Sequence, residues 1–175
     1  PFAFAPGDSE VPYPPGTQDL HYEMEFVVAI GQSVFRASQE EAAAAVFGYG
    51  CGLDMTRRDL QQKAKDTRRS WDVGKDFENS AVLTDLATAD SVGEIGNQRI
   101  HLSVNGMIRQ DAVLSDMIWS VEEIICHLST LYHLGSGDLI MTGTPAGVGP
   151  VGPGDTLTGG IDGLPDLSLS ITDAE

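Results

Sequence analysis

The chain has 175 residues, a length typical of one domain, and its hydrophobic content of 41% is enough for a proper core. No run approaches the length of a membrane span, and no basic segment precedes an apolar one as in a signal peptide. The net charge of −16 argues against nucleic acids and anionic membranes as partners, because both require a positive field.

The two cysteines, Cys51 and Cys126, could form one disulfide, but their settings favour free thiols. Cys51 lies in a glycine-rich strand pattern, and Cys126 lies on the apolar face of a predicted helix. Buried free thiols fit a reducing compartment, so we expect a cytoplasmic protein. The spacing of the two residues matches no zinc-binding pattern.

Residues 1–20 are rich in proline and glycine, which predicts a brief strand followed by an irregular, partly extended segment. Residues 21–30 then form a strong strand pattern that stops at Gly31. Side chains alternate between the two faces of a strand. Glu23 and Glu25 therefore share one face, opposite the apolar side chains between and beside them.

The two glutamates would lie roughly 7 Å apart, where their charges repel by about 2.4 kcal/mol at an effective dielectric near 20. A strand that enters a core tolerates this repulsion poorly unless a cation lies between the carboxylates. Two interpretations are open from the pair alone: a solvated edge strand, or a metal site whose further ligands lie elsewhere in the chain.

Two helices are predicted with a strand between them. Ser38 and Glu41 have the spacing of a capping box and predict a short helix over residues 42–46. Residues 48–54 form a strand whose glycines indicate a bulge or a close backbone approach. Thr56 and Asp59 resemble a second capping pair. Asp54 is then either an N-cap itself or a side chain at a strand end that is available as a ligand.

Seven of the ten basic residues fall between positions 57 and 75. This cluster is either an anion-binding region or a helix paired with acidic neighbours. Asp54, Arg58 and Gln61 are spaced by four and three residues, which places them on one helix face. Lys75 follows a glycine, and a lone lysine is normally solvated.

The remainder alternates between strands and turns. We expect a loop over residues 85–97, a hairpin turning at Asn105-Gly106, and an amphipathic helix capped by Ser120 and Glu123 that ends at Gly135. Short strands follow. The glycines around Thr144 can present backbone N–H groups to an anion, but the segment lacks the Lys-Ser/Thr ending of a nucleotide-binding P-loop.

Five segments stand out in this order: HYEME (21–25), GLDMTRRDLQ (52–61), GKDF (74–77), VNG with RQ (104–106 and 109–110) and TGTPAGVG (142–149). Together they resemble the fumarylacetoacetate hydrolase family, over nearly the whole chain. The sequence of the second segment, together with PPG at 14–16, is similar to the branch of fumarylpyruvate and acylpyruvate hydrolases.

The resemblance implies one catalytic domain over residues 1–175, with a β-rich α+β fold in which a mixed sheet is rolled into a barrel beside a few short helices. It implies a homodimer that binds Mg²⁺ or Mn²⁺, with Ca²⁺ as a substitute, through Glu23, Glu25 and Asp54. Oxygen ligands suit such ions. It further implies that Arg58, Gln61, Lys75 and Thr144 contact a small anionic 2-oxo acid, with Lys75 stabilising an enolate or carboxylate.

The sequence departs from the family pattern in one important respect. The family activates water with a His-x-x-Glu pair upstream of the acidic strand, and no histidine precedes His21. We therefore expect the general base, with an N-terminal lid segment, upstream of this sequence. The implied reaction is hydrolysis of a carbon–carbon bond in a 3-acylpyruvate, with fumarylpyruvate as the first choice. The alternatives are an isomerase or decarboxylase of a related 2-oxo acid such as oxaloacetate, and a non-catalytic metal-binding protein.

Overall fold

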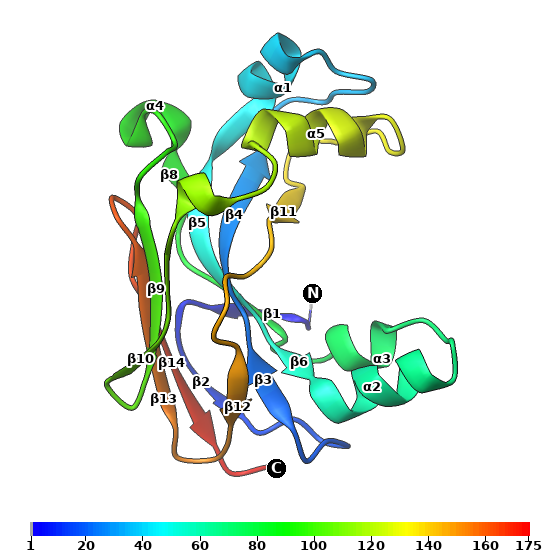
Figure 1. Ribbon diagram of the computed structural model, residues 1–175, viewed down its shortest axis with the longest axis vertical. Helices are drawn as coiled ribbons and strands as arrows, with labels where there is room; N and C mark the ends of the chain where they lie inside the picture. The colour runs from blue at the N-terminus through cyan, green and yellow to red at the C-terminus, as the bar shows by residue number, and fades with distance from the viewer. Residues whose placement is uncertain (1) are drawn as a thin grey trace.

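The computed structural model describes residues 2–175, in which strands form three sheets and the helices are short (Figure 1). The six-stranded sheet follows the order β1 (Phe4–Pro6), β7 (Ala81–Leu83), β5 (Val46–Asp54), β4 (Met24–Ile30) and β11 (Leu139–Met141), with β8 (Ala87–Thr88) also paired to β5.

The other two sheets are smaller. The five-stranded sheet follows the order β10 (Met107–Val113), β9 (Arg99–Val104), β13 (Thr156–Ile161), β14 (Leu167–Thr172) and β2 (Asp8–Pro12). The three-stranded sheet consists of β12 (Gly149–Val151), β3 (Leu20–Tyr22) and β6 (Thr56–Arg57).

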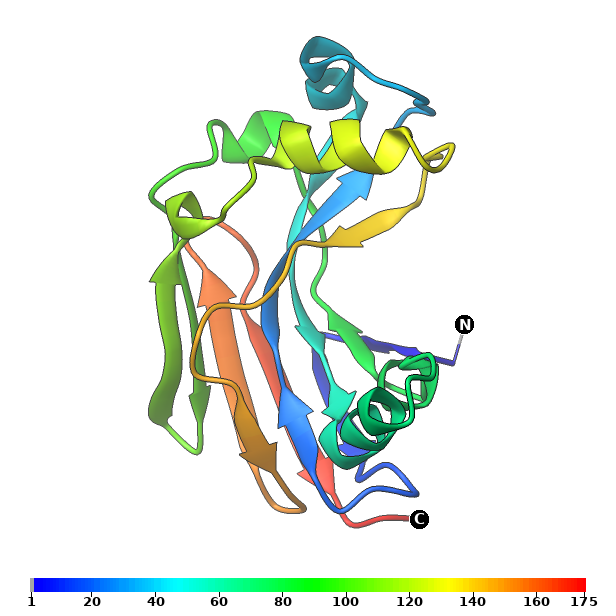
Figure 2. The ribbon, with the colours of Figure 1, turned by 45° about the vertical axis from the view of Figure 1, so that its right-hand side comes forward.

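Most strand pairs are antiparallel, but β1 with β7 and β14 with β2 are parallel, so the predicted mixed, β-rich α+β architecture is confirmed. The expected barrel is not closed. Within residues 2–175 each sheet is open, with an edge strand on either side, and the strands are curved (Figure 2). The buried core draws on both larger sheets, with Phe26 and Leu53 from one and Leu102, Leu157 and Leu169 from the other.

Helices gather at two places. Helices α1 (Gln39–Ala45) and α5 (Val121–Ser129) lie together at one end, with α4 (Ala89–Val92) beside β5, whereas α2 (Arg58–Asp66) and α3 (Asp72–Lys75) project together beside β6 (Figure 1). A 3-10 turn, η1, covers Leu114–Asp116. Within the described part of the chain, every helix is too short or too polar to cross a bilayer.

Several predictions that depend only on residues close together in the chain are confirmed. Both Ser38 and Ser120 form capping boxes with the glutamate three residues on. The chain also turns at Asn105-Gly106, where both residues have positive φ angles. The cysteines are free, with Cys51 buried.

Four local predictions are wrong. Helix α2 begins at Arg58 without a side-chain cap, since Thr56 lies in β6 and Asp59 accepts hydrogen bonds from Thr17 and Gln18 instead. Helix α5 ends at Ser129, well before Gly135. The segment 85–97 contains β8 and α4, and the irregular part of residues 1–20 contains β2, because both segments pair with strands distant in sequence.

Candidate metal centre and active site

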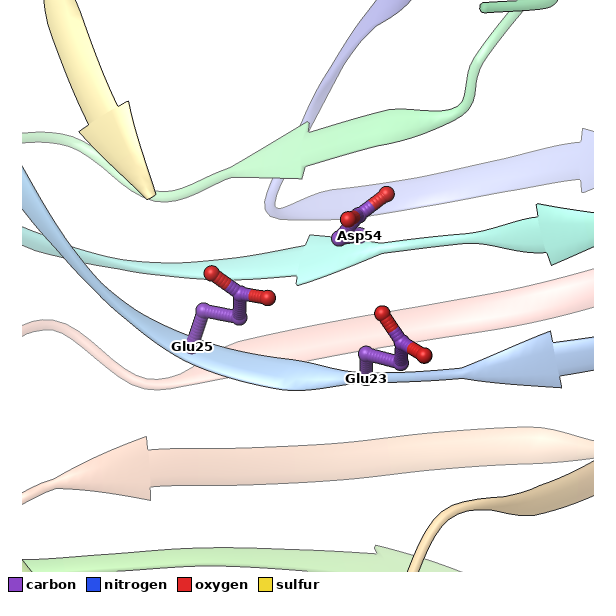
Figure 3. A group of neighbouring side chains, drawn as sticks. All are labelled: Glu23, Glu25 and Asp54. Carbon is purple, nitrogen blue, oxygen red and sulfur yellow. The ribbon is translucent and has the colours of Figure 1, made fainter. Parts of the chain in front are cut away.

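Three carboxylates converge where β3 and β4 meet the end of β5 (Figure 3). Glu23 lies between β3 and β4, Glu25 lies on β4, and Asp54 ends β5. Each contributes one oxygen, and these atoms lie within 4.8 Å of one another. The Asp54 N–H donates to the Glu23 carbonyl oxygen at 2.9 Å, so the backbone register fixes the cluster. The structure thus brings together the three predicted ligands.

Two cations from the helical pair meet the same carboxylates. The Lys75 Nζ donates to Glu23 Oε2 at 2.7 Å, to Asp54 Oδ2 at 2.5 Å and to Thr56 Oγ1 at 2.8 Å. The Arg58 guanidinium donates to Glu23 Oε1 at 2.5 Å and to Gln61 Oε1 at 2.9 Å. Lys75 is therefore a partner of the acidic cluster rather than a solvated lysine.

Close packing places Lys75 there. Helix α3 lies against α2 through Gly74, where a Cβ would come within 3.0 Å of the Gln61 backbone nitrogen. The glycine lets the two helices approach, and the next side chain then reaches the cluster. Gln61 is 3% exposed and accepts from Arg58, so in this structure it orients the guanidinium.

The three carboxylates differ in their electrostatic surroundings. Burial works against the charge of Glu23, but hydrogen bonds from Lys75 and Arg58 outweigh it and lower its pKa. Burial outweighs Lys75 at Asp54 and raises its pKa. Burial also raises the pKa of Glu25 to about 7, opposed by the N–H of Gly143 and assisted by the charges of Asp54 and Glu23.

The donor set fits a hard divalent cation. Glu25 is 5% exposed, and among residues 2–175 no lysine or arginine forms an ion pair with it. A buried carboxylate of this kind is costly unless a positive charge is near. Three carboxylate oxygens suit Mg²⁺ or Mn²⁺, which keep further positions for water or ligand, and Ca²⁺ accepts the same donors.

The loop that contains Thr144 contacts the acidic cluster through Gly143. The Gly143 N–H donates to Glu25 Oε2 at 2.8 Å, which places Thr144 one residue from a contact with a candidate ligand. A cavity of about 540 Å³ lies along the same loop, but it is lined by Phe26 and Trp119 and not by the carboxylates. Gly143 and Thr144 also line this cavity, so it adjoins the acidic cluster through the same loop.

Two buried side chains next to the site, Thr56 and Gln110, were given no site role from the sequence. Thr56 is fully buried beneath Lys75, and Gln110 is fully buried behind the Thr144 loop. The available signal was a glutamine at an inward position of the returning hairpin strand, where a bulge shifts the register between Ile108 and Gln110. Among residues 2–175, the hydrogen bonds of the three carboxylates involve no histidine.

Comparison with known proteins extends the resemblance seen in the sequence. A fumarylpyruvate hydrolase from Ralstonia sp is 48% identical over 165 residues, which cover 94% of this chain and 85% of the relative. An oxaloacetate tautomerase, YcgM, from Escherichia coli (strain K12) is 40% identical over 145 residues, which cover 82% of this chain and 66% of the relative.

The fold is shared as well. The crystal structure of a fumarylpyruvate hydrolase from Pseudomonas aeruginosa, in complex with Mn²⁺ and pyruvate, matches with a TM-score of 0.95 at 42% identity, covering 98% of this chain and 76% of that one. The family model described as fumarylacetoacetate (FAA) hydrolase, C-terminal, matches residues 1–172. From its motifs, its fold and these matches, the chain belongs to the fumarylacetoacetate hydrolase family.

Proposed function

We propose that the protein is a metal-dependent enzyme that hydrolyses a carbon–carbon bond in a 3-acylpyruvate. Fumarylpyruvate is the proposed substrate; with one water it yields fumarate and pyruvate. The observation that carries this proposal is the cluster of Glu23, Glu25 and Asp54 beside two cations, in a chain 48% identical to a fumarylpyruvate hydrolase.

Glu23, Glu25 and Asp54 would hold Mg²⁺ or Mn²⁺. The similarity to the Pseudomonas aeruginosa enzyme, whose structure contains Mn²⁺ and pyruvate, supports this assignment. When bound, such an ion supplies positive charge for the oxygens of a 2-oxo acid, on which negative charge develops as the carbon–carbon bond breaks.

The side chains of Lys75 and Arg58 would bind and orient the anionic substrate. A lysine has three N–H donors, and all three are occupied here by Glu23, Asp54 and Thr56. Lys75 can serve a substrate oxygen only when a carboxylate turns toward an ion and releases one donor. Arg58 uses two of its five donors on Glu23 and Gln61, so it has others to offer.

Lys75 would also stabilise the pyruvate enolate that leaves first. Its ammonium is held beside the cluster by Glu23, Asp54 and Thr56 before substrate binds, so a donor that a carboxylate releases is already close to the developing charge. The base that activates water is proposed, from the family resemblance, to be a His-x-x-Glu pair upstream of His21. No described residue is assigned that role.

Pyruvate release tests the proposal directly. The full-length gene product is mixed with fumarylpyruvate and Mg²⁺, and lactate dehydrogenase reports pyruvate through loss of reduced nicotinamide. We expect turnover that disappears with a chelator and returns with Mn²⁺. If the folded, full-length protein forms no pyruvate with either ion, the hydrolase assignment is overturned.

A second candidate is keto–enol isomerisation or decarboxylation of oxaloacetate, favoured by the 40% identity to an oxaloacetate tautomerase. The same preparation is given oxaloacetate, with enol absorbance and carbon dioxide followed separately. Loss of enol without carbon–carbon cleavage selects a tautomerase, and carbon dioxide release selects a decarboxylase. Metal binding without turnover of either substrate selects the remaining alternative, a non-catalytic binding protein.

A further inference from the structure

We propose that Gln110 is a positioning residue that turns the Thr144 hydroxyl toward the substrate as a hydrogen-bond donor. This inference rests on the proposed function in one respect, namely that the ligand is a 2-oxo acid with an anionic oxygen. Gln110 itself contacts no reacting group in the proposal. It acts through Thr144.

Gln110 joins three backbone or side-chain groups that are far apart in sequence. It is 0% exposed, and its Oε1 accepts from the Met24 N–H at 3.0 Å. Its Nε2 donates to Thr144 Oγ1 at 2.7 Å and to the Pro145 carbonyl oxygen at 2.8 Å. Met24 separates the two glutamates of the metal cluster, so one amide spans from the ligand strand to the Thr144 loop.

The chemistry of the partners fixes the orientation of this amide. The Met24 N–H can only donate, so it must face Oε1, and the Pro145 carbonyl can only accept, so it must face Nε2. Thr144 Oγ1 therefore receives a hydrogen bond from Nε2. The hydroxyl proton of Thr144 must then point elsewhere, and accepting a bond strengthens the hydroxyl as a donor.

The direction of that proton is useful because of where the loop lies. Gly143, the residue before Thr144, donates its N–H to Glu25 Oε2 at 2.8 Å, so Thr144 adjoins the acidic cluster. Thr142 Oγ1 donates to the Phe26 carbonyl at 2.8 Å, and the Tyr22 hydroxyl donates to the Gly147 carbonyl at 2.9 Å. Both ends of the loop are thus tied to β3 and β4, and Gln110 holds its middle.

A double-mutant cycle separates this role from simple support of the fold. Pyruvate is the probe, and its Kd is measured by calorimetry with Mn²⁺ saturating each variant. Thr144→Val removes the hydroxyl at constant shape, and Gln110→Met removes the amide at similar size. We expect each single substitution to raise the pyruvate Kd about 10-fold, the value typical of a hydrogen bond to a charged group.

The decisive measurement is the double variant. If Gln110 acts through the Thr144 hydroxyl, then Gln110→Met in the Thr144→Val background changes the Kd by less than about 2-fold. A role in general support would make the two effects multiply. Multiplying effects, or an unchanged Kd in either single variant, would overturn the inference.

Two further variants serve as controls. Gln110→Glu keeps the size and the acceptor for Met24, but its carboxylate has no N–H for Thr144, so it should reproduce the loss even if Gln110→Met folds poorly. Ser129→Ala is the matched control. Ser129 is also fully buried and forms two hydrogen bonds, with Ala37 and Cys126, in and near helix α5, and we expect its removal to leave the pyruvate Kd unchanged.

The outcomes also separate the two proposals. If the effects of the Gln110 and Thr144 substitutions on the pyruvate Kd are coupled but fumarylpyruvate is not hydrolysed, the role of Gln110 is retained and the hydrolase is rejected. If fumarylpyruvate is hydrolysed but the two effects multiply, the hydrolase is retained and the role of Gln110 is rejected. If the wild-type protein with Mn²⁺ does not bind pyruvate, the role given to Gln110 is rejected as well.

Discussion

Glu25 differs from its two neighbours in having a backbone N–H, rather than a cation, as its hydrogen-bond partner. Glu23 is held by Lys75 and Arg58, and Asp54 by Lys75, whereas Glu25 receives only the Gly143 N–H among the described residues. The chain thus compensates two of three charges. A divalent ion would compensate the third, which makes Glu25 the most informative position for substitution.

We expect Glu25→Gln and Asp54→Asn to weaken Mn²⁺ binding by at least about 10-fold, since ion affinity in oxygen sites depends on the number of charged ligands. Titration calorimetry on the metal-free protein measures the loss, and circular dichroism checks that each variant folds. Because both substitutions keep the side-chain shape, unchanged affinity in both variants would count against the metal centre.

Asp59 provides a test of stability against pH. Partial burial works against its charge, but hydrogen bonds from the Thr17 hydroxyl and the N–H groups of Gln18 and Leu60 outweigh it and lower the pKa of Asp59. A carboxylate with a lowered pKa stabilises the fold above its unfolded pKa of about 3.9, and this contribution is lost as pH falls through the folded-state pKa.

We therefore expect Asp59→Asn to lower the Tm by about 2 °C at pH 7, the scale of a modest loss in a domain of this size. The difference from wild type should begin to shrink below about pH 4 and vanish only as the pH falls through the lower folded-state pKa, where folded Asp59 becomes protonated. Thermal unfolding followed by circular dichroism measures both. A Tm difference that stays constant from pH 7 to pH 3 would show that the charge of Asp59 contributes nothing.

At the scale of elements, strand β5 shows how small residues allow close packing. Glycines occupy every second position along β5, and the chain around β8 closely approaches two of them, Gly48 and Gly50. A Cβ at Gly48 would overlap the carbonyl oxygen of Ala87. The glycine-rich strand predicted from the sequence is thus a close backbone approach, which holds β5 and its terminal Asp54 in place.

Gly48→Ala should destabilise the protein by more than about 2 kcal/mol, because the clash is with backbone and cannot be relieved by a rotamer. Gly96→Ala is the control, since nothing lies within 4 Å of a Cβ there, and it should change stability by less than about 0.5 kcal/mol. Urea unfolding of the two variants gives both values. Equal effects at the two positions would contradict the packing argument.

At the scale of the whole molecule, the charge is strongly unbalanced. The chain carries −16, yet seven of its ten basic residues lie between positions 57 and 75, in and around the helical pair that faces the carboxylates. Two of them, Arg58 and Lys75, bind the acidic cluster directly. The two interpretations of the basic cluster are therefore compatible: these cations pair with acidic neighbours, and in the proposed function they also receive an anionic substrate.

The homodimer implied by the family resemblance stays a prediction, and charge offers a way to test it. Two copies at −16 repel, and salt screens that repulsion. We expect sedimentation velocity of the full-length protein to show a two-chain species whose proportion rises between low salt and about 0.15 M salt. A single-chain species at every salt concentration would reject the homodimer.

The sequence alone determined the features that depend on neighbours along the chain. Three-residue spacing predicted the capping boxes at Ser38 and Ser120, and Asn105-Gly106 marked a hairpin. Alternation predicted that Glu23 and Glu25 lie on one side of the chain, and their carboxylates do meet, although Glu23 lies between β3 and β4 rather than within one unbroken strand. Each of these follows from backbone geometry over a few residues, which is why each holds in the structure.

Only the tertiary structure decided which distant groups meet. Thr56 and Asp59 have capping spacing, but Thr56 pairs with β3 and Asp59 accepts hydrogen bonds from Thr17 and Gln18, so the predicted capping pair does not form. Likewise, no spacing rule relates Gln110 to Thr144, or Lys75 to Glu23. Such contacts form because sheet pairing and helix packing bring segments together through space, and a buried polar group must then bond to whatever partner lies within reach.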